Sequence, residues 1–150
     1  MTSFARAADL LAVDPGADLG VSRWITISQD RINQFAQCTE DDQWIHVDAD
    51  RARSGPYGGT IAHGYLTLSL AATMLTEVIH VGGIGAAVNY GANKVRFPNP
   101  VPVGAKVRGH VRLGATSRRG EMIEACYALT VEIQDATKPA CVADLVVLYT

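Results

Sequence analysis

The run of residues 61–79, IAHGYLTLSLAATMLTEVI, constrains the fold more than any other segment, because Glu77 is its only residue certain to be charged. A membrane-spanning helix needs about 20 predominantly apolar residues. This run is barely that long, and His63, Gly64 and several Thr and Ser residues interrupt it. A helix that is apolar all round is otherwise buried on all sides in a globular protein. We therefore expect one long, buried central helix and no membrane span.

The rest of the chain has an ordinary globular composition. Of its 150 residues, 48% are hydrophobic and 19% are charged, so we expect a single domain over residues 1–150 with a core that needs no disulfide or metal. The formal net charge of −2 argues against a non-specific nucleic-acid binder, which needs a strong basic field. The three cysteines are odd in number and lack metal-like spacing, and residues 1–20 show no secretory signal. We therefore expect reduced cysteines and a cytoplasmic protein.

The two halves of the chain predict different elements. In the N-terminal half, the patterns favour a helix over residues 3–12, a strand over 21–27, and a helix over 28–38 that Ser28 caps. In the C-terminal half, the patterns favour four strands with short connections, which is typical of antiparallel neighbours. These strands are residues 87–97, 105–116, 122–134 and 141–149. The fold class is therefore α+β, with an antiparallel sheet wrapped around the central helix, and a dimer could cover the open sheet edges.

Residues 40–48, EDDQWIHVD, form the densest cluster of ionisable groups. Asp41 and His46 are five positions apart, so they converge only if residues 42–45 form a turn. The alternative is a solvated acidic loop whose apolar residues reach the core. Asp41, His46 and Asp48 also offer metal ligands, but there is no HExxH sequence, no calcium loop containing glycine and no cysteine ligand set. We expect no metal.

Residues 58–65, GGTIAHGY, place His63 and Gly64 near the start of the expected central helix. Backbone N–H groups in a first helical turn have no partner within the helix, so they can receive a developing negative oxygen. Glycine also leaves room for a ligand to approach. The alternative is a glycine that allows tight packing and a His63 that caps the local backbone.

Residues 94–104, KVRFPNPVPVG, join an expected strand to a turn stiffened by proline. Alternation places Lys94 and Arg96 on one face of this strand and Val95 and Phe97 on the other. Two cations beside a stiff turn could hold phosphate groups. The alternative is an ordinary polar strand face.

Three stretches, in this order, resemble the MaoC-like family of (R)-specific enoyl-CoA hydratases. They are FAQCTEDDQWIHVD at 35–48, GGTIAHGYLTL at 58–68 and NYGANKVRFPNPVPVG at 89–104. The resemblance implies the hot-dog fold and an enzyme that adds water to trans-2-enoyl thioesters to give (3R)-hydroxyacyl thioesters, with no cofactor. It also implies a homodimer in which the CoA part of the substrate lies across the subunit interface.

The resemblance further implies which residues act. The catalytic aspartate and histidine of the family fall on Asp41 and His46, and the helix-start glycine, whose N–H binds the thioester oxygen, falls on Gly64. We expect further substrate contacts from His63, Tyr65, Lys94 and Arg96, with the last two on the CoA phosphates. The family usually has Gly before the aspartate and Asn-Pro within the turn. This chain has Glu40 and Gln43-Trp44 there, departures that bear on loop shape and acyl-chain length.

Two rival functions remain at this point. A hot-dog acyl-CoA thioesterase would need a carboxylate facing a water beside the thioester carbonyl carbon. A non-catalytic acyl-CoA-binding module would need no Asp–His pair, and the pair in this chain argues against it. The spacing of Asp41 and His46 favours the hydratase.

Overall fold

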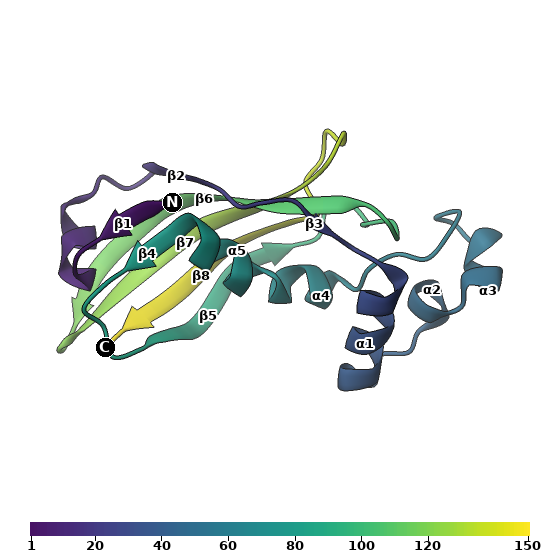
Figure 1. Ribbon diagram of the computed structural model, residues 1–150, viewed down its shortest axis with the longest axis horizontal. Helices are drawn as coiled ribbons and strands as arrows, with labels where there is room; N and C mark the ends of the chain where they lie inside the picture. Colours follow the sequence, from purple (N-terminus) through teal and green to yellow (C-terminus); the bar gives the residue numbers. More distant parts are fainter.

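The computed structural model describes residues 1–150. A long sheet curves along a central helical segment, and short helices gather at one end of the molecule (Figure 1). The α+β class is therefore confirmed. In chain order the elements are β1 (Thr2–Phe4), the 3-10 helix η1 (Ala7–Ala12), β2 (Asp18–Val21), β3 (Ile25–Thr26), α1 (Gln29–Thr39), α2 (Trp44–Val47), α3 (Ala49–Arg53), α4 (Gly64–Ser69), α5 (Ala71–Val78), β4 (Ile79–Val81), β5 (Ala87–Arg96), β6 (Lys106–Arg119), β7 (Met122–Ile133) and β8 (Cys141–Tyr149).

The main sheet has the strand order β2-β6-β7-β8-β5, and β3 pairs with β6 as well. Its neighbours are all antiparallel, and the hairpins β6–β7 and β7–β8 confirm the expected pairings. The strand β5 differs, because it precedes β6 in the chain but pairs with β8 at the opposite edge. The expectation that residues 87–97 and 105–116 are neighbours is therefore wrong.

The connection from β5 to β6 explains this arrangement. It runs beside the extended segment 60–62 that leads into α4, where Ala62 N–H donates to the Val101 carbonyl (2.8 Å) and Val103 N–H donates to the Thr60 carbonyl (3.0 Å). The backbone of this proline-rich connection thus forms hydrogen bonds with the segment before α4, and the connection does not close a hairpin between β5 and β6. Residues 60–62 are extended for the same reason, so the central helix begins at Gly64 and not at residue 61.

The central helix consists of α4 and α5, separated by a single irregular residue. Leu70 lies between them, donates its N–H to the Leu66 carbonyl (3.2 Å) and accepts from Met74 N–H (3.0 Å), so bonding continues across the break. The sheet covers only one side of this helix. Ala72 and Thr76 are exposed, and the expectation of burial on all sides is wrong for the single chain. None of the helices is long and apolar enough to cross a bilayer.

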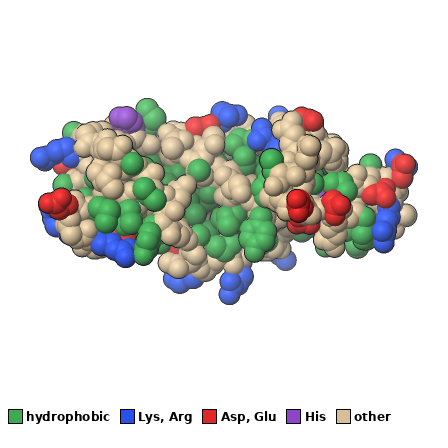
Figure 2. Space-filling model, turned by 90° about the horizontal axis from the view of Figure 1, so that it is seen from below, with side chains coloured by type: hydrophobic (Ala, Val, Ile, Leu, Met, Phe, Trp, Pro, Cys, Tyr) green, Lys and Arg blue, Asp and Glu red, His purple; other side chains and the backbone are tan.

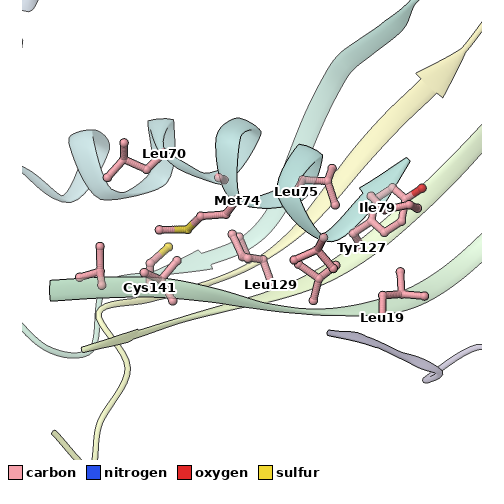
Figure 3. Close-up of a cluster of buried hydrophobic side chains, with 14 of the residues drawn as sticks. Leu19, Leu70, Met74, Leu75, Ile79, Tyr127, Leu129 and Cys141 are labelled. Atoms are coloured by element: carbon pink, nitrogen blue, oxygen red, sulfur yellow. The ribbon is translucent and has the colours of Figure 1, made fainter. Parts of the chain in front are cut away.

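The buried side of the helix packs on the sheet. Met74 and Leu75 lie on the side of the helix that faces the sheet, where Leu129, Tyr127 and Cys141 are drawn (Figure 3). They belong to one cluster of 29 buried hydrophobic residues, which draws on the N-terminal segment, the helices and the sheet. A single continuous core therefore joins the helix to strands from both the N-terminal and the C-terminal half of the chain.

The N-terminal segment differs most from the sequence prediction. Residues 3–12 were expected to form a helix, but Thr2–Phe4 is a strand parallel to β4 and only Ala7–Ala12 is helical, as a 3-10 turn. The expected strand 21–27 is two short strands, β2 and β3, both paired with β6. Between these strands, buried Ser22 makes two hydrogen bonds with Gly109. Its N–H donates to the Gly109 carbonyl (2.8 Å), and its hydroxyl accepts from Gly109 N–H (2.9 Å).

Gly109 on β6 lies where sheet and helix approach each other closely. A β-carbon added there would lie 2.8 Å from Met74 Cβ and 3.0 Å from Leu129 Cδ1. We expect Gly109→Ala to lower the free energy of unfolding by about 1–3 kcal/mol, since an extra methyl group forces the packed core apart. Urea denaturation is the measurement. Gly59→Ala, at a position with no atom within 4 Å of the added carbon, is the matched control and should change little.

Candidate active site

The first functional segment is the turn between α1 and α2. Ser28 caps α1 by accepting from Arg31 N–H (3.2 Å), as expected, and α1 ends at Glu40 in the left-handed conformation, with φ of 60° and ψ of 18°. The chain then reverses, and α2 starts at Trp44. The Arg51 guanidinium lies 4.3 Å from the centre of the Trp44 ring and helps to fix this turn. The turn that the sequence required between Asp41 and His46 is therefore present.

His46 is oriented by the segment 60–62. Its ring is buried, with 6% exposed, and its Nδ1 lies 2.7 Å from the Ile61 carbonyl oxygen. A carbonyl only accepts, so Nδ1 carries the proton and Nε2 of the neutral ring carries the lone pair. The Ile61 N–H in turn donates to the Ile45 carbonyl (3.0 Å), which ties α2 to the same segment. Nε2 is left free for chemistry.

Asp41, His46 and His63 form one cluster. One nitrogen of each histidine and a carboxylate oxygen of Asp41 all lie within 4.8 Å of one another. The His46 and His63 rings are stacked, with centroids 3.8 Å apart and planes inclined by 27°. Lone pairs of stacked rings run side by side and do not converge on one point, so this set suits proton transfer better than tetrahedral binding of a metal ion. Asp48, the third ligand considered from sequence, accepts from Arg51 N–H (2.9 Å) as the cap of α3.

The pKa of His46 lies below its ordinary value of 6.5. Burial is the main cause, because it disfavours the charged imidazolium, and the neighbouring His63 acts in the same direction. The hydrogen bond to Ile61 and the charge of Asp41 oppose the shift. His46 is therefore a neutral base or acceptor near neutral pH.

A cavity of about 220 Å³ opens between His46 and Gly64. Gly64 begins α4, and its N–H has no hydrogen-bond partner in the chain. A β-carbon at Gly64 would lie 3.0 Å from the Phe97 ring, so this position requires glycine for the close approach of Phe97. The lining residues are His46, Tyr57, Ile61, Ala62, Gly64, Thr67, Phe97, Asn99, Pro100, Val101 and Ala140.

Four residues expected to contact substrate lie outside the lining of this cavity. His63 is 2% exposed and sits behind His46, and Tyr65 is 68% exposed and meets the Phe97 ring edge-on at 6.0 Å. Lys94 has a φ of 52° in an irregular stretch of β5, so the expected alternation with Arg96 does not hold. Lys94 pairs with Asp144 (3.2 Å), and Arg96 donates to the Val95 carbonyl (2.7 Å).

Phe97 lines the cavity, although the sequence pattern did not indicate it. Alternation had placed it on the face away from the cations, and nothing in that pattern showed that this face meets Gly64. The available signal was position, because Phe97 directly precedes the proline-rich connection of the third matching stretch. Asn99 and Val101, from the same connection, also reach the cavity.

Comparison with known proteins agrees with this geometry. The family model described as "MaoC like domain" matches residues 11–135. The chain belongs to the MaoC-like domain family. The 3-hydroxyacyl-thioester dehydratase Z of Mycobacterium tuberculosis is 47% identical over 150 residues, which is 99% of each chain.

Solved structures support the fold of this MaoC-like chain. The R-hydratase PhaJ1 of Pseudomonas aeruginosa superposes with a TM-score of 0.76 at 19% identity, over 93% of this chain and 84% of that one. A chain of the (3R)-hydroxyacyl-ACP dehydratase HadBC complex of Mycobacterium tuberculosis superposes with a TM-score of 0.74 at 16% identity, over 91% and 98% of the two chains. The fold is the hot-dog fold, as the resemblance implied.

The lowered pKa of His46 predicts how stability changes with pH. The unfolded chain takes up a proton on this imidazole at a higher pH than the folded chain does, so acidification from above 6.5 toward the lower folded value favours unfolding. We expect the free energy of unfolding to fall more steeply on acidification in the wild type than in His46→Gln. Urea denaturation at several pH values between about 7.5 and 5 measures both dependences. Parallel curves for the two proteins would contradict the lowered pKa of His46.

Proposed function

We propose that this MaoC-like chain is an (R)-specific enoyl-CoA hydratase/dehydratase, which interconverts trans-2-enoyl and (3R)-hydroxyacyl thioesters. One observation carries the proposal: the exposed Asp41 carboxylate lies within 4.8 Å of a ring nitrogen of His46, and His46 lines a cavity together with Gly64, whose N–H is free. Hydration needs a group that activates water and a donor for the thioester oxygen, and this cavity offers both. The 47% identity to a 3-hydroxyacyl-thioester dehydratase over nearly the whole chain supports the same reaction.

The residues divide the reaction as follows. The Asp41 carboxylate accepts a proton from a water molecule, and the free Nε2 of His46 orients this water. The hydroxyl adds to C3 of the enoyl thioester, and the proton is delivered to C2. Negative charge passes through the thioester oxygen, where the Gly64 N–H stabilises it by about 3 kcal/mol. Elimination is the same path in reverse.

We also propose which carrier the substrate has, that no cofactor is needed and where in the cell the protein works. Addition of water changes no oxidation state, and a backbone N–H polarises the thioester, so the reaction runs without a metal or cofactor. We assign CoA as the carrier, because a chain with a net charge of −2 has no overall basic field for an acidic carrier protein. All three cysteines are unpaired, which fits the reducing cytoplasm.

The reaction is tested with purified protein and a series of trans-2-enoyl-CoA substrates. Loss of the conjugated-thioester absorbance reports hydration, and chiral chromatography of the product should give the (3R) form. We expect Asp41→Asn and His46→Gln each to lower kcat at least about 100-fold, since each removes a group that handles the water. Asp42→Asn, the same change one position along in a residue outside the Asp41–His46–His63 cluster, is the matched control. A chelator should leave the wild-type rate unchanged.

Other outcomes would contradict the proposal. Release of free thiol without loss of the enoyl group would indicate a thioesterase. Tight binding of enoyl-CoA without turnover would indicate a binding module. Wild-type turnover in Asp41→Asn would remove the assigned roles.

We further propose that the chain works as a homodimer joined along β5 and the open side of the central helix. This edge strand is exposed along nearly its whole length, and an exposed edge is a site for pairing. Two apolar hollows of about 280 and 200 Å³ lie between the helix and β5, and Ala72 of α5 lines both. Figure 2 shows hydrophobic side chains gathered in the middle of the face seen from below, with charged groups mainly around the rim. A second copy would cover this face.

The dimer is tested at position 72. We expect Ala72→Glu to shift the protein from dimer to monomer in sedimentation equilibrium, because a charge would be buried in the contact. Ala136→Glu, at an exposed alanine in the β7–β8 turn, should remain dimeric. A wild type that sediments as a monomer, or an Ala72→Glu dimer of unchanged affinity, would refute the interface.

A further inference from the structure

His63 contacts both Asp41 and His46, and it uses a different part of its ring for each contact. Its Nε2 lies 2.9 Å from the Asp41 carbonyl oxygen, so the Nε2–H donates there. Its face stacks on His46, with ring centroids 3.8 Å apart. The Phe35 ring of α1 lies beside it, with centroids 5.0 Å apart. One side chain therefore touches α1, the Asp41 turn and α2.

The second ring nitrogen of His63 indicates why a histidine stands here. Nδ1 is buried and has no hydrogen-bond partner. An unpaired buried acceptor destabilises a fold, so a side chain selected only for packing would be apolar. The site instead needs an aromatic face and an N–H donor on the same ring, and histidine supplies both.

We propose that His63 is a positioning residue that sets the separation between the Asp41 carboxylate and His46 Nε2. It holds the Asp41 backbone by its Nε2–H and supports the His46 ring by its face, while it takes no part in the chemistry itself. This inference rests on the proposed function only for its kinetic consequence, since the contacts themselves do not require turnover. It also replaces the expected substrate contact of His63, which lies outside the cavity lining.

Two substitutions separate the contacts. His63→Phe keeps the stacked ring but removes the donor to Asp41. His63→Gln removes the ring, yet its amide N–H can occupy about the place of Nε2. We expect His63→Phe to lower kcat roughly ten- to a hundredfold with little change in KM, because a misplaced carboxylate still permits binding. Part of this loss should be recovered in His63→Gln. Thermal unfolding of both variants checks that they are folded.

An NMR measurement needs no turnover. The nitrogen shifts of His63 in the wild type should report a proton on Nε2 and none on Nδ1.

The outcomes are separable. A wild type that hydrates no enoyl-CoA but shows the Nε2 tautomer of His63 contradicts the proposed function and supports the positioning by His63. Wild-type kcat in His63→Phe overturns the inference. Equal loss in both variants, accompanied by equal loss of thermal stability, also overturns it, because the residue would then be only a packing element.

Discussion

The extended segment 60–62 is hydrogen-bonded on both sides, and the site depends on this arrangement. On one side it pairs with the proline-rich connection through Val101 and Val103. On the other side, Ile61 N–H donates to the Ile45 carbonyl and the Ile61 carbonyl accepts from His46 Nδ1. Residues 60–62 therefore join the sheet, the start of α4 and the turn between Asp41 and His46. The geometry of the cavity follows from the backbone hydrogen bonds of these three residues.

Local features of the fold could be read from the sequence because local chemistry determines them. Ser28 caps α1, and β8 has the expected bounds, since a capping hydroxyl and an alternating strand act through neighbours in the chain. The convergence of Asp41 and His46 could be stated as a condition, and the structure meets it. The family resemblance supplied the fold, which the comparisons confirm.

Long-range features could not be read in the same way. Alternation in β5 shows that it is a strand but does not say which strand pairs with it, so its place at the far edge depended on where residues 97–105 found hydrogen-bond partners. The conformation of Lys94 could not be read from the alternating pattern either. Its positive φ breaks the alternation that had placed it beside Arg96, and it pairs with Asp144 of the neighbouring strand. The position of Phe97 against Gly64 likewise depends on tertiary packing.

Glu40 occupies a left-handed conformation directly before Asp41, where members of the resembled family usually have glycine. A residue with a β-carbon is disfavoured there by about 1–2 kcal/mol, an amount that a marginally stable domain can tolerate. Glutamate and glycine codons differ by a single transition, so the unstrained form lies one mutational step away. A single mutational step at this position would therefore relax the backbone of the turn that leads to Asp41.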